Sequence, residues 1–210
     1  MLKLPDRDLI EKATANADWD LGNQILYDMC KHNFLHDSTG TIIAKTWLIG
    51  RSYAVALERR NTSDNLSNDD FYVNKIVPLF KESFVDDSLK ALALIPEINN
   101  ENVEKCLKLH FELMYKIKGI TGLNKRSFCA KYLHFHLPDI FFIYDSRALG
   151  ALNKIFLKYS IKNISQIPHN NDLEYLIFCR KCLHLIREIK ETYGILLTNR
   201  KLDKVLLAMN

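Results

Sequence analysis

The chain has 210 residues, of which 48% are apolar and 26% are charged, a balance typical of a globular protein with a hydrophobic core and unlike that of a disordered chain. Only 7 glycines and 5 prolines are present, which argues against a β-sandwich or barrel and favours helices. The net charge of +4 is too small to identify a class of partner. The first residues, MLKLPDRDLIEKA, are charged and no run of about 18 apolar residues follows, so we expect neither a signal peptide nor a membrane span.

The five cysteines are scattered and odd in number, which argues against a disulfide framework and predicts a reducing, cytoplasmic location. Cys179 and Cys182 lie three residues apart and are followed by His184, but no second CxxC pair exists to complete a metal site. Their spacing also fits one buried face of a helix, and we favour that interpretation.

Apolar residues recur at helical spacing through most of the chain, as at Leu21, Ile25, Leu26 and Met29. The predicted helices cover approximately 5–17, 19–35, 40–60, 69–84, 87–95, 101–117, 124–136, 146–159, 172–192 and 199–208. Polar loops are predicted at 59–70 and 161–172. We therefore predict an all-α fold, one domain over 1–210 that the first loop can divide into two lobes.

The segment MYKIKGITGLNKRSFCAKYLHF is predicted to form a helix, a tight turn and a second helix. Gly119 and Gly122 permit positive φ angles, and Asn124 is one of the few other residues that tolerate them. The second helix then begins with unpaired amides beside Lys125 and Arg126, an arrangement that attracts phosphate. An ordinary corner between two helices is the alternative.

Charge supports the phosphate interpretation, because no acidic residue occurs between Glu112 and Asp139 while five basic residues do. A solvated helix face is the plainer explanation of the same charges.

Asp145 stands before the helix predicted at 146–159. Free amides and the positive end of a helix favour the charged form of a carboxyl group at this position. Such a carboxylate suits the stabilisation of a developing cation, or the orientation of a water molecule, better than it suits proton donation. A plain helix cap is the alternative.

Together these elements resemble the helix-hairpin-helix DNA glycosylase superfamily, which includes endonuclease III and the 8-oxoguanine glycosylases. In this chain ITGLN stands for the family's hairpin, KR for its basic position, FCAKYLHFH for the following helix and FFIYDSRA for the aspartate segment. The resemblance covers roughly 115–155, within a hairpin and aspartate region of about 103–159, and the 20 positions between Lys125 and Asp145 (145 − 125 = 20) are compatible with the family's spacing.

The resemblance implies an enzyme that binds double-stranded DNA, flips out one modified or damaged nucleotide and cleaves the N-glycosidic bond. Asp145 is the implied catalytic carboxylate. The implied DNA-binding residues are Gly119, Gly122, Asn124, Lys125, Arg126, Ser127 and Arg147. Base-excision repair and defence against modified phage DNA are both open as the biological role, and we expect a monomer.

Two departures from the family pattern concern the hairpin. Asn124 replaces the second glycine, and either Lys125 or Arg126 can stand at the family's lysine position. Only a lysine can form a Schiff base, so the Lys125 register permits a lyase and the Arg126 register implies a monofunctional glycosylase. We favour the latter and keep Lys125 as the alternative catalytic residue.

The resemblance implies no cofactor, because relatives of endonuclease III carry four cysteines for an iron–sulfur cluster near the C-terminus and this chain has two there. No metal site is predicted either. A metal-dependent nuclease built from His134, His136 and Asp145 stays an alternative, as does a non-catalytic DNA-binding module.

The base pocket is the least defined part of the prediction. Trp47 and Tyr53 could stack on a base, although such residues on one helix belong more often to a core.

Overall fold

The computed structural model describes residues 2–15, 17–18, 20–62, 65–156 and 172–209. Within these ranges the regular elements are helices and no strand occurs, which confirms the predicted all-α class. The elements are α1 (Arg7–Thr14), α2 (Asp20–His32), α3 (Thr39–Ser52), α4 (Asn68–Phe71), the π-helical η1 (Tyr72–Ile76), α5 (Val77–Phe80), α6 (Ser83–Leu92), α7 (Val103–Cys106), α8 (Lys108–Thr121), α9 (Arg126–His136), α10 (Ser146–Ile155), α11 (Leu173–Tyr193) and α12 (Asn199–Ala208).

Capping residues define several of the helix ends. The Thr198 side chain caps α12 by accepting a hydrogen bond from the amide of Lys201. Helices α8 and α11 each end at a left-handed glycine, Gly122 with φ 71° and Gly194 with φ 70°.

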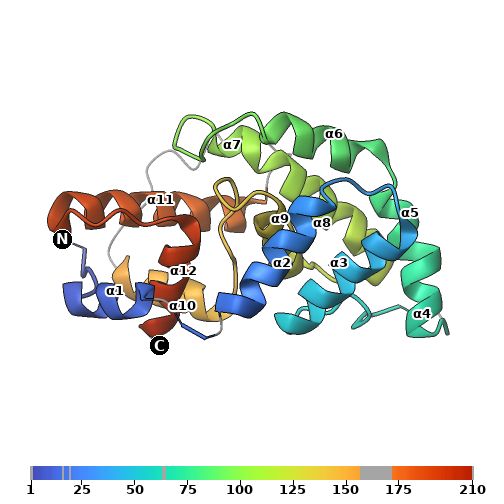
Figure 1. The fold of residues 1–210 in the computed structure, drawn as a ribbon, viewed down its shortest axis with the longest axis horizontal. Coiled ribbons are helices and arrows are strands. Elements are labelled where there is room, and N and C mark those ends of the chain that lie inside the picture. Colours follow the sequence, from blue (N-terminus) through green and yellow to red (C-terminus); the bar gives the residue numbers. More distant parts are fainter. Residues whose placement is uncertain (1, 16, 19, 63–64, 157–171, 210) are drawn as a thin grey trace.

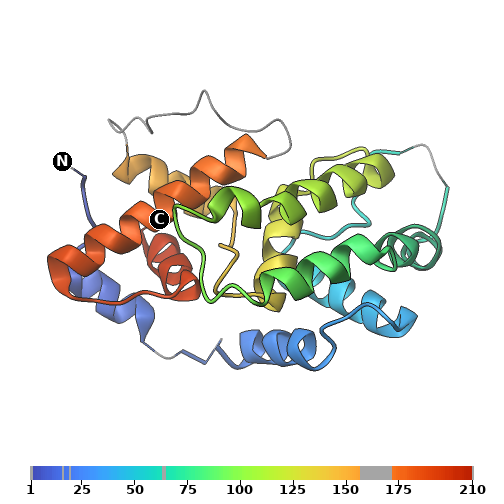
Figure 2. The same ribbon diagram turned by 90° about the horizontal axis from the view of Figure 1, so that it is seen from above.

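The helices form two groups that share one hydrophobic core (Figures 1 and 2). At one end of the molecule, α1 and α10 pack against α12, and α10 also contacts α11. In the second group, α2, α3 and α8 pack around α9 near the middle of the molecule. The N-terminal helix α1 therefore packs in the same group as the C-terminal helices α10 to α12. The connection from α9 to α10 runs from one group to the other.

Helix α9 is the centre of the fold, because every residue from Phe128 to His136 is buried. Its polar side chains find partners, as burial requires. The Tyr132 hydroxyl lies 2.5 Å from Nε2 of His36, whose Nδ1 lies 2.5 Å from a carboxylate oxygen of Asp86.

Several helix boundaries differ from the predicted ones. The helix predicted at 40–60 ends at Ser52, because Ala54 takes a positive φ of 54° and the chain turns back to place the Val55 amide 2.7 Å from the Gly50 carbonyl. The segment predicted as 69–84 comprises α4, η1 and α5, and α6 starts at Ser83 rather than near 87. The predicted loop at 161–172 lies outside the described residues except for Asp172, as does the end of the helix predicted at 146–159.

Among the described residues, no helix combines the length and apolarity that crossing a membrane requires.

Candidate active site

Asp145 occupies the N-cap position of α10, with φ −152° and ψ 172°. One carboxylate oxygen, Oδ1, accepts a hydrogen bond of 2.9 Å from the amide of Ala148. The side chain keeps 22% of its surface exposed, so one carboxylate oxygen caps the helix and the group still reaches solvent.

The chain enters this cap through a buried segment without regular secondary structure, 140–144, and side chains from neighbouring helices bind three of its carbonyl groups. His134 donates from Nδ1 to the Phe141 carbonyl at 2.6 Å, and the Tyr175 hydroxyl donates to the Phe142 carbonyl at 2.6 Å. The carbonyl immediately before Asp145 accepts from the hydroxyl of Ser127 at 2.7 Å and from the ammonium of Lys131 at 3.1 Å. These bonds satisfy a backbone that has no sheet partner, and they fix the position of Asp145.

A cavity of about 720 Å³ opens in front of Asp145, at the place where the two helix groups meet. We call it the Asp145 cavity. Its walls come from the end of α3, from α9, from the start of α10 and from α12. The lining residues are Ser52, Tyr53, Ala54, Val55, Ser127, Lys131, Tyr144, Asp145, Ser146, Arg147, Leu149, Asp203 and Leu207.

Lys131 brings a buried amine into this cavity. Only 2% of the residue is exposed, and its Nζ lies 2.8 Å from the Ser127 hydroxyl and 3.8 Å from Oδ2 of Asp145. Burial lowers the pKa of the Lys131 ammonium, and the Asp145 carboxylate opposes that shift. No local sequence feature distinguishes Lys131 from the other lysines of the basic interval.

Asp203 supplies a second carboxyl group, from α12. The residue is 3% exposed, and Oδ2 accepts a hydrogen bond of 2.5 Å from Nη1 of Arg200. The other oxygen, Oδ1, is buried and has no hydrogen-bond partner among the described residues. Burial raises the pKa of the Asp203 carboxyl group to about 6. No sequence motif pointed to Asp203, since it lies 58 residues beyond Asp145 (203 − 145 = 58) on another helix.

The turn between α8 and α9 is closely packed on one side. Gly122 takes the left-handed conformation there, and a Cβ atom on it would lie 2.4 Å from the Asn61 carbonyl oxygen. The Asn61 amide donates to the Thr121 carbonyl at 2.7 Å. Gly119 lies within α8 and not in the turn, so the expected role for it as a turn residue has no counterpart in the backbone.

The start of α9 is open on its other side. Lys125 is its N-cap residue and makes no side-chain capping bond, and its carbonyl accepts from the Cys129 amide at 3.0 Å. A small pocket of about 130 Å³ lies beside this helix start and is lined by Asn124, Lys125 and Ser127 among others. It shares Ala54, Val55 and Ser127 with the Asp145 cavity, so the starts of α9 and α10 face adjoining depressions.

The two basic residues of the turn bind the protein itself. The Lys125 ammonium donates to the carbonyls of Ala56, at 2.9 Å, and of Arg59, and burial lowers its pKa. Arg126 pairs with Asp172 and Glu174 near the start of α11. Neither residue lines the Asp145 cavity.

Of the three remaining predicted site residues, two line the Asp145 cavity and one does not. Arg147 and Tyr53 line the Asp145 cavity, and the Tyr53 ring lies 5.7 Å from Nζ of Lys131. Trp47 is 44% exposed on α3 next to Arg51 and lies outside the cavity lining.

The histidines considered as metal ligands have other partners. His134 accepts from the Tyr27 hydroxyl at 2.6 Å, and His136 donates to the Tyr132 carbonyl and accepts from the Lys45 ammonium at 3.2 Å. Within the described ranges, no three histidine, cysteine, aspartate or glutamate side chains gather as they would around a metal ion. All five cysteines are buried free thiols.

Comparisons with protein-family models, with curated proteins and with solved structures found no match.

Proposed function

We propose that this protein is a DNA glycosylase that excises a modified or damaged base, with Asp145 as its catalytic carboxylate. The observation that carries the proposal is the placement of Asp145 at the rim of a large cavity whose mouth adjoins the start of α9. A base-releasing enzyme needs a recess for a flipped nucleotide and a separate grip on the phosphate backbone. We assign the first role to the cavity and the second to the adjoining helix start.

The reaction assigned to the cavity is hydrolysis. As the bond between the base and C1′ breaks, positive charge develops on the sugar, and the Asp145 carboxylate stabilises it. A water molecule adds its oxygen to C1′, one of its protons is lost to solvent, and the departing base nitrogen takes up a proton. Lys131 holds the backbone carbonyl before Asp145 and keeps its ammonium 3.8 Å from Oδ2, which positions the carboxylate.

A hydrolytic, monofunctional enzyme is favoured over a lyase, because the Lys125 ammonium is bound by two carbonyls and does not line the cavity. Borohydride should therefore trap no covalent complex with Lys125. A trapped complex that maps to Lys131, the amine in the cavity, would instead make the enzyme a lyase.

The test is base release, detected by mass spectrometry, from a panel of damaged and naturally modified duplex DNAs. Asp145→Asn is the informative variant, since asparagine also caps helices well and should preserve α10. Asp69→Asn, an exposed carboxylate in the first turn of α4, is the matched control. Release by the native protein and Asp69→Asn but not by Asp145→Asn supports the proposal, and salt-sensitive DNA binding without release from any DNA favours a binding module.

A further inference from the structure

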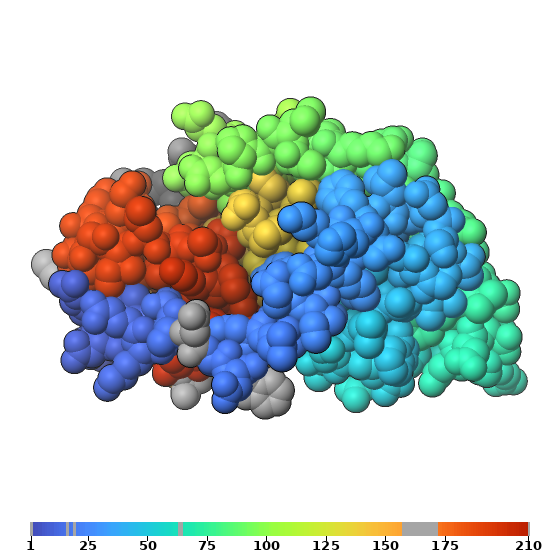
Figure 3. Space-filling view, viewed as in Figure 1, coloured from blue at the N-terminus to red at the C-terminus, as the bar shows by residue number. Residues whose placement is uncertain are grey.

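A second cavity, of about 490 Å³, lies on the face of the molecule shown in Figure 3. There the yellow surface of the chain around the end of α9 forms the bottom of a hollow between the blue α2 and the red C-terminal helices. We call it the Tyr27 cavity. Its volume falls in the range of small-molecule sites, roughly 300–1,000 Å³.

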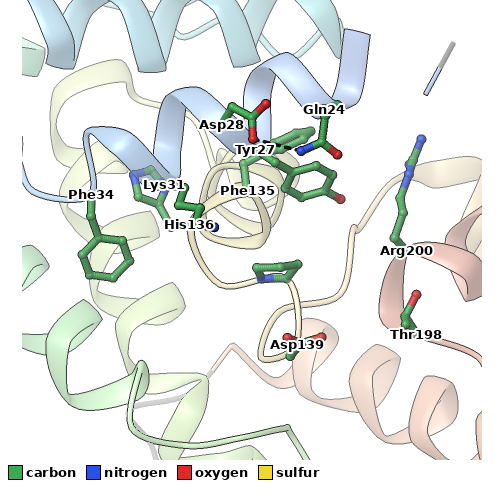
Figure 4. A pocket seen from close by; sticks show the side chains of 11 residues that line it. Gln24, Tyr27, Asp28, Lys31, Phe34, Phe135, His136, Asp139, Thr198 and Arg200 are labelled. Atoms are coloured by element: carbon green, nitrogen blue, oxygen red, sulfur yellow. Dashed lines mark hydrogen bonds between the residues drawn. The ribbon is translucent and has the colours of Figure 1, made fainter. Parts of the chain in front are cut away.

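One wall of the Tyr27 cavity is aromatic (Figure 4). The rings of Tyr27 and Phe135 lie 4.7 Å apart between centroids, and those of Phe34 and His136 lie 6.2 Å apart. The hydroxyl of Tyr27 donates to His134, so this ring is held in place. Adjacent aromatic faces beside a recess suit a planar ring, because stacking on them requires no particular hydrogen-bond pattern.

The rim of the cavity carries two cations on opposite sides. Lys31 projects from α2, and Arg200 projects from the start of α12 (Figure 4). Lys31 is exposed, and the guanidinium of Arg200 is bound to Asp203 through only one of its nitrogens in the described contacts. Two cations on opposite sides of one recess attract a group with several anionic oxygens.

The rim also carries two carboxylates, Asp28 and Asp139. Asp28 accepts one bond of 2.9 Å from the Gln24 side chain, and Asp139 is exposed on the connection from α9 to α10. Carboxylates beside an aromatic wall accept hydrogen bonds from ring N–H or sugar O–H groups. A ligand that matches all three features has a planar ring, hydrogen-bond donors and an anionic group.

We propose that the Tyr27 cavity binds a nucleoside monophosphate, with its base against Tyr27, Phe34 and Phe135 and its phosphate between Lys31 and Arg200. This site is separate from the Asp145 cavity and does not depend on the glycosylase proposal. The two cavities meet at the Arg200–Asp203 ion pair, since Arg200 lines the Tyr27 cavity and Asp203 lines the Asp145 cavity. A phosphate that binds Arg200 therefore changes the surroundings of a group in the Asp145 cavity.

The test is isothermal titration of the full chain with four mononucleotides that differ in base, and with the matching nucleosides, inorganic phosphate, and free tyrosine and tryptophan. At least one mononucleotide should bind about tenfold or more tightly than its nucleoside, because the nucleoside loses the charge-assisted bonds to the two cations. Lys31→Gln should weaken binding of that mononucleotide roughly fivefold to tenfold. Lys118→Gln, another exposed lysine, far along the chain on α8, should leave it unchanged.

Phe34→Ala is the second variant, since Phe34 is only half-buried and its loss should weaken the same mononucleotide without unfolding the protein. Three results would each overturn the proposal. The first is that no mononucleotide binds at millimolar concentration. The second is that the native protein, Lys31→Gln and Phe34→Ala bind the mononucleotide equally well. The third is that a free aromatic amino acid binds more tightly than any mononucleotide.

Discussion

At the scale of single residues, the site depends on which lysine faces Asp145. Lys125 follows the hairpin turn, but its ammonium bonds to the Ala56 and Arg59 carbonyls, whereas Lys131 lies within the cavity. Lys131→Met should reduce base release by roughly tenfold to a hundredfold, because the bonds through which the ammonium holds the carbonyl before Asp145 and positions the carboxylate are lost. Lys125→Gln should leave the rate of release near that of the native protein and cost about 1 kcal/mol of folding stability. Single-turnover rates and urea unfolding would measure both, and a larger loss of rate in Lys125→Gln than in Lys131→Met would contradict this assignment.

The buried histidines predict that the free energy of unfolding falls in acid. Burial lowers the pKa values of His36, His110 and His134 to about 4, below the ordinary value of about 6.5. The unfolded chain therefore binds protons first, so this stabilisation is complete above about pH 6.5 and is lost as the pH falls toward 4. Each histidine should contribute about 2 kcal/mol to the loss by about pH 5. Asp203 acts in the opposite direction, since its raised pKa of about 6 makes the folded state bind a proton first.

Urea unfolding at about pH 7 and about pH 5 would measure this loss. His110→Gln should show a smaller difference between the two conditions than the native protein, because one of the three groups is removed. An unfolding free energy that stays the same at both pH values would contradict the prediction.

At the scale of elements, the turn between α8 and α9 should tolerate no side chain at Gly122. Its φ of 71° costs an alanine about 1 kcal/mol, and the added Cβ would lie 2.4 Å from a backbone oxygen of Asn61. We expect Gly122→Ala to lower the free energy of unfolding by about 3 kcal/mol or more. Gly194→Ala is a matched control, with φ 70° and nothing within 4 Å of the added atom, and should cost only about 1 kcal/mol. Equal costs for the two variants would mean that the Asn61 contact is unimportant.

The elements were predictable from sequence where local signals decide them. The helix predicted at 199–208 matches α12, because the Thr198 cap and the spacing of Leu202, Val205 and Leu206 define it locally. The helix predicted at 40–60 was too long, since its end depends on the close approach of residues 55 and 56 to Gly50.

The candidate site was predictable only in part. Asp145 could be identified because it immediately precedes an amphipathic helix. Lys131 could not, since only the packing of α9 in the middle of the fold buries this lysine beside Asp145. Asp203 could not either, because a contact between α10 and α12 brings it near, and no periodicity in the sequence encodes that contact.

At the scale of the whole molecule, the proposed function predicts a DNA-binding face that includes the mouth of the Asp145 cavity and the adjoining start of α9. Arg147 lines the cavity, and Arg59 lines the neighbouring pocket with an exposed side chain. Replacing each arginine by alanine should make the slope of log association constant against log salt concentration shallower by about one. The change should be the same for all DNA sequences. Lys90→Ala, which replaces an exposed lysine on α6 outside the basic interval, serves as the control. Unchanged slopes in Arg59→Ala and Arg147→Ala would place the DNA on another face.

The most direct test of the central claim is the single-turnover rate of base release by Asp145→Asn, measured on the DNA that the native protein processes best. The proposal predicts a fall of at least about a thousandfold, with DNA affinity and melting temperature close to those of the native protein. An Asp145→Asn protein that releases the base at the native rate would contradict the claim that Asp145 is the catalytic carboxylate.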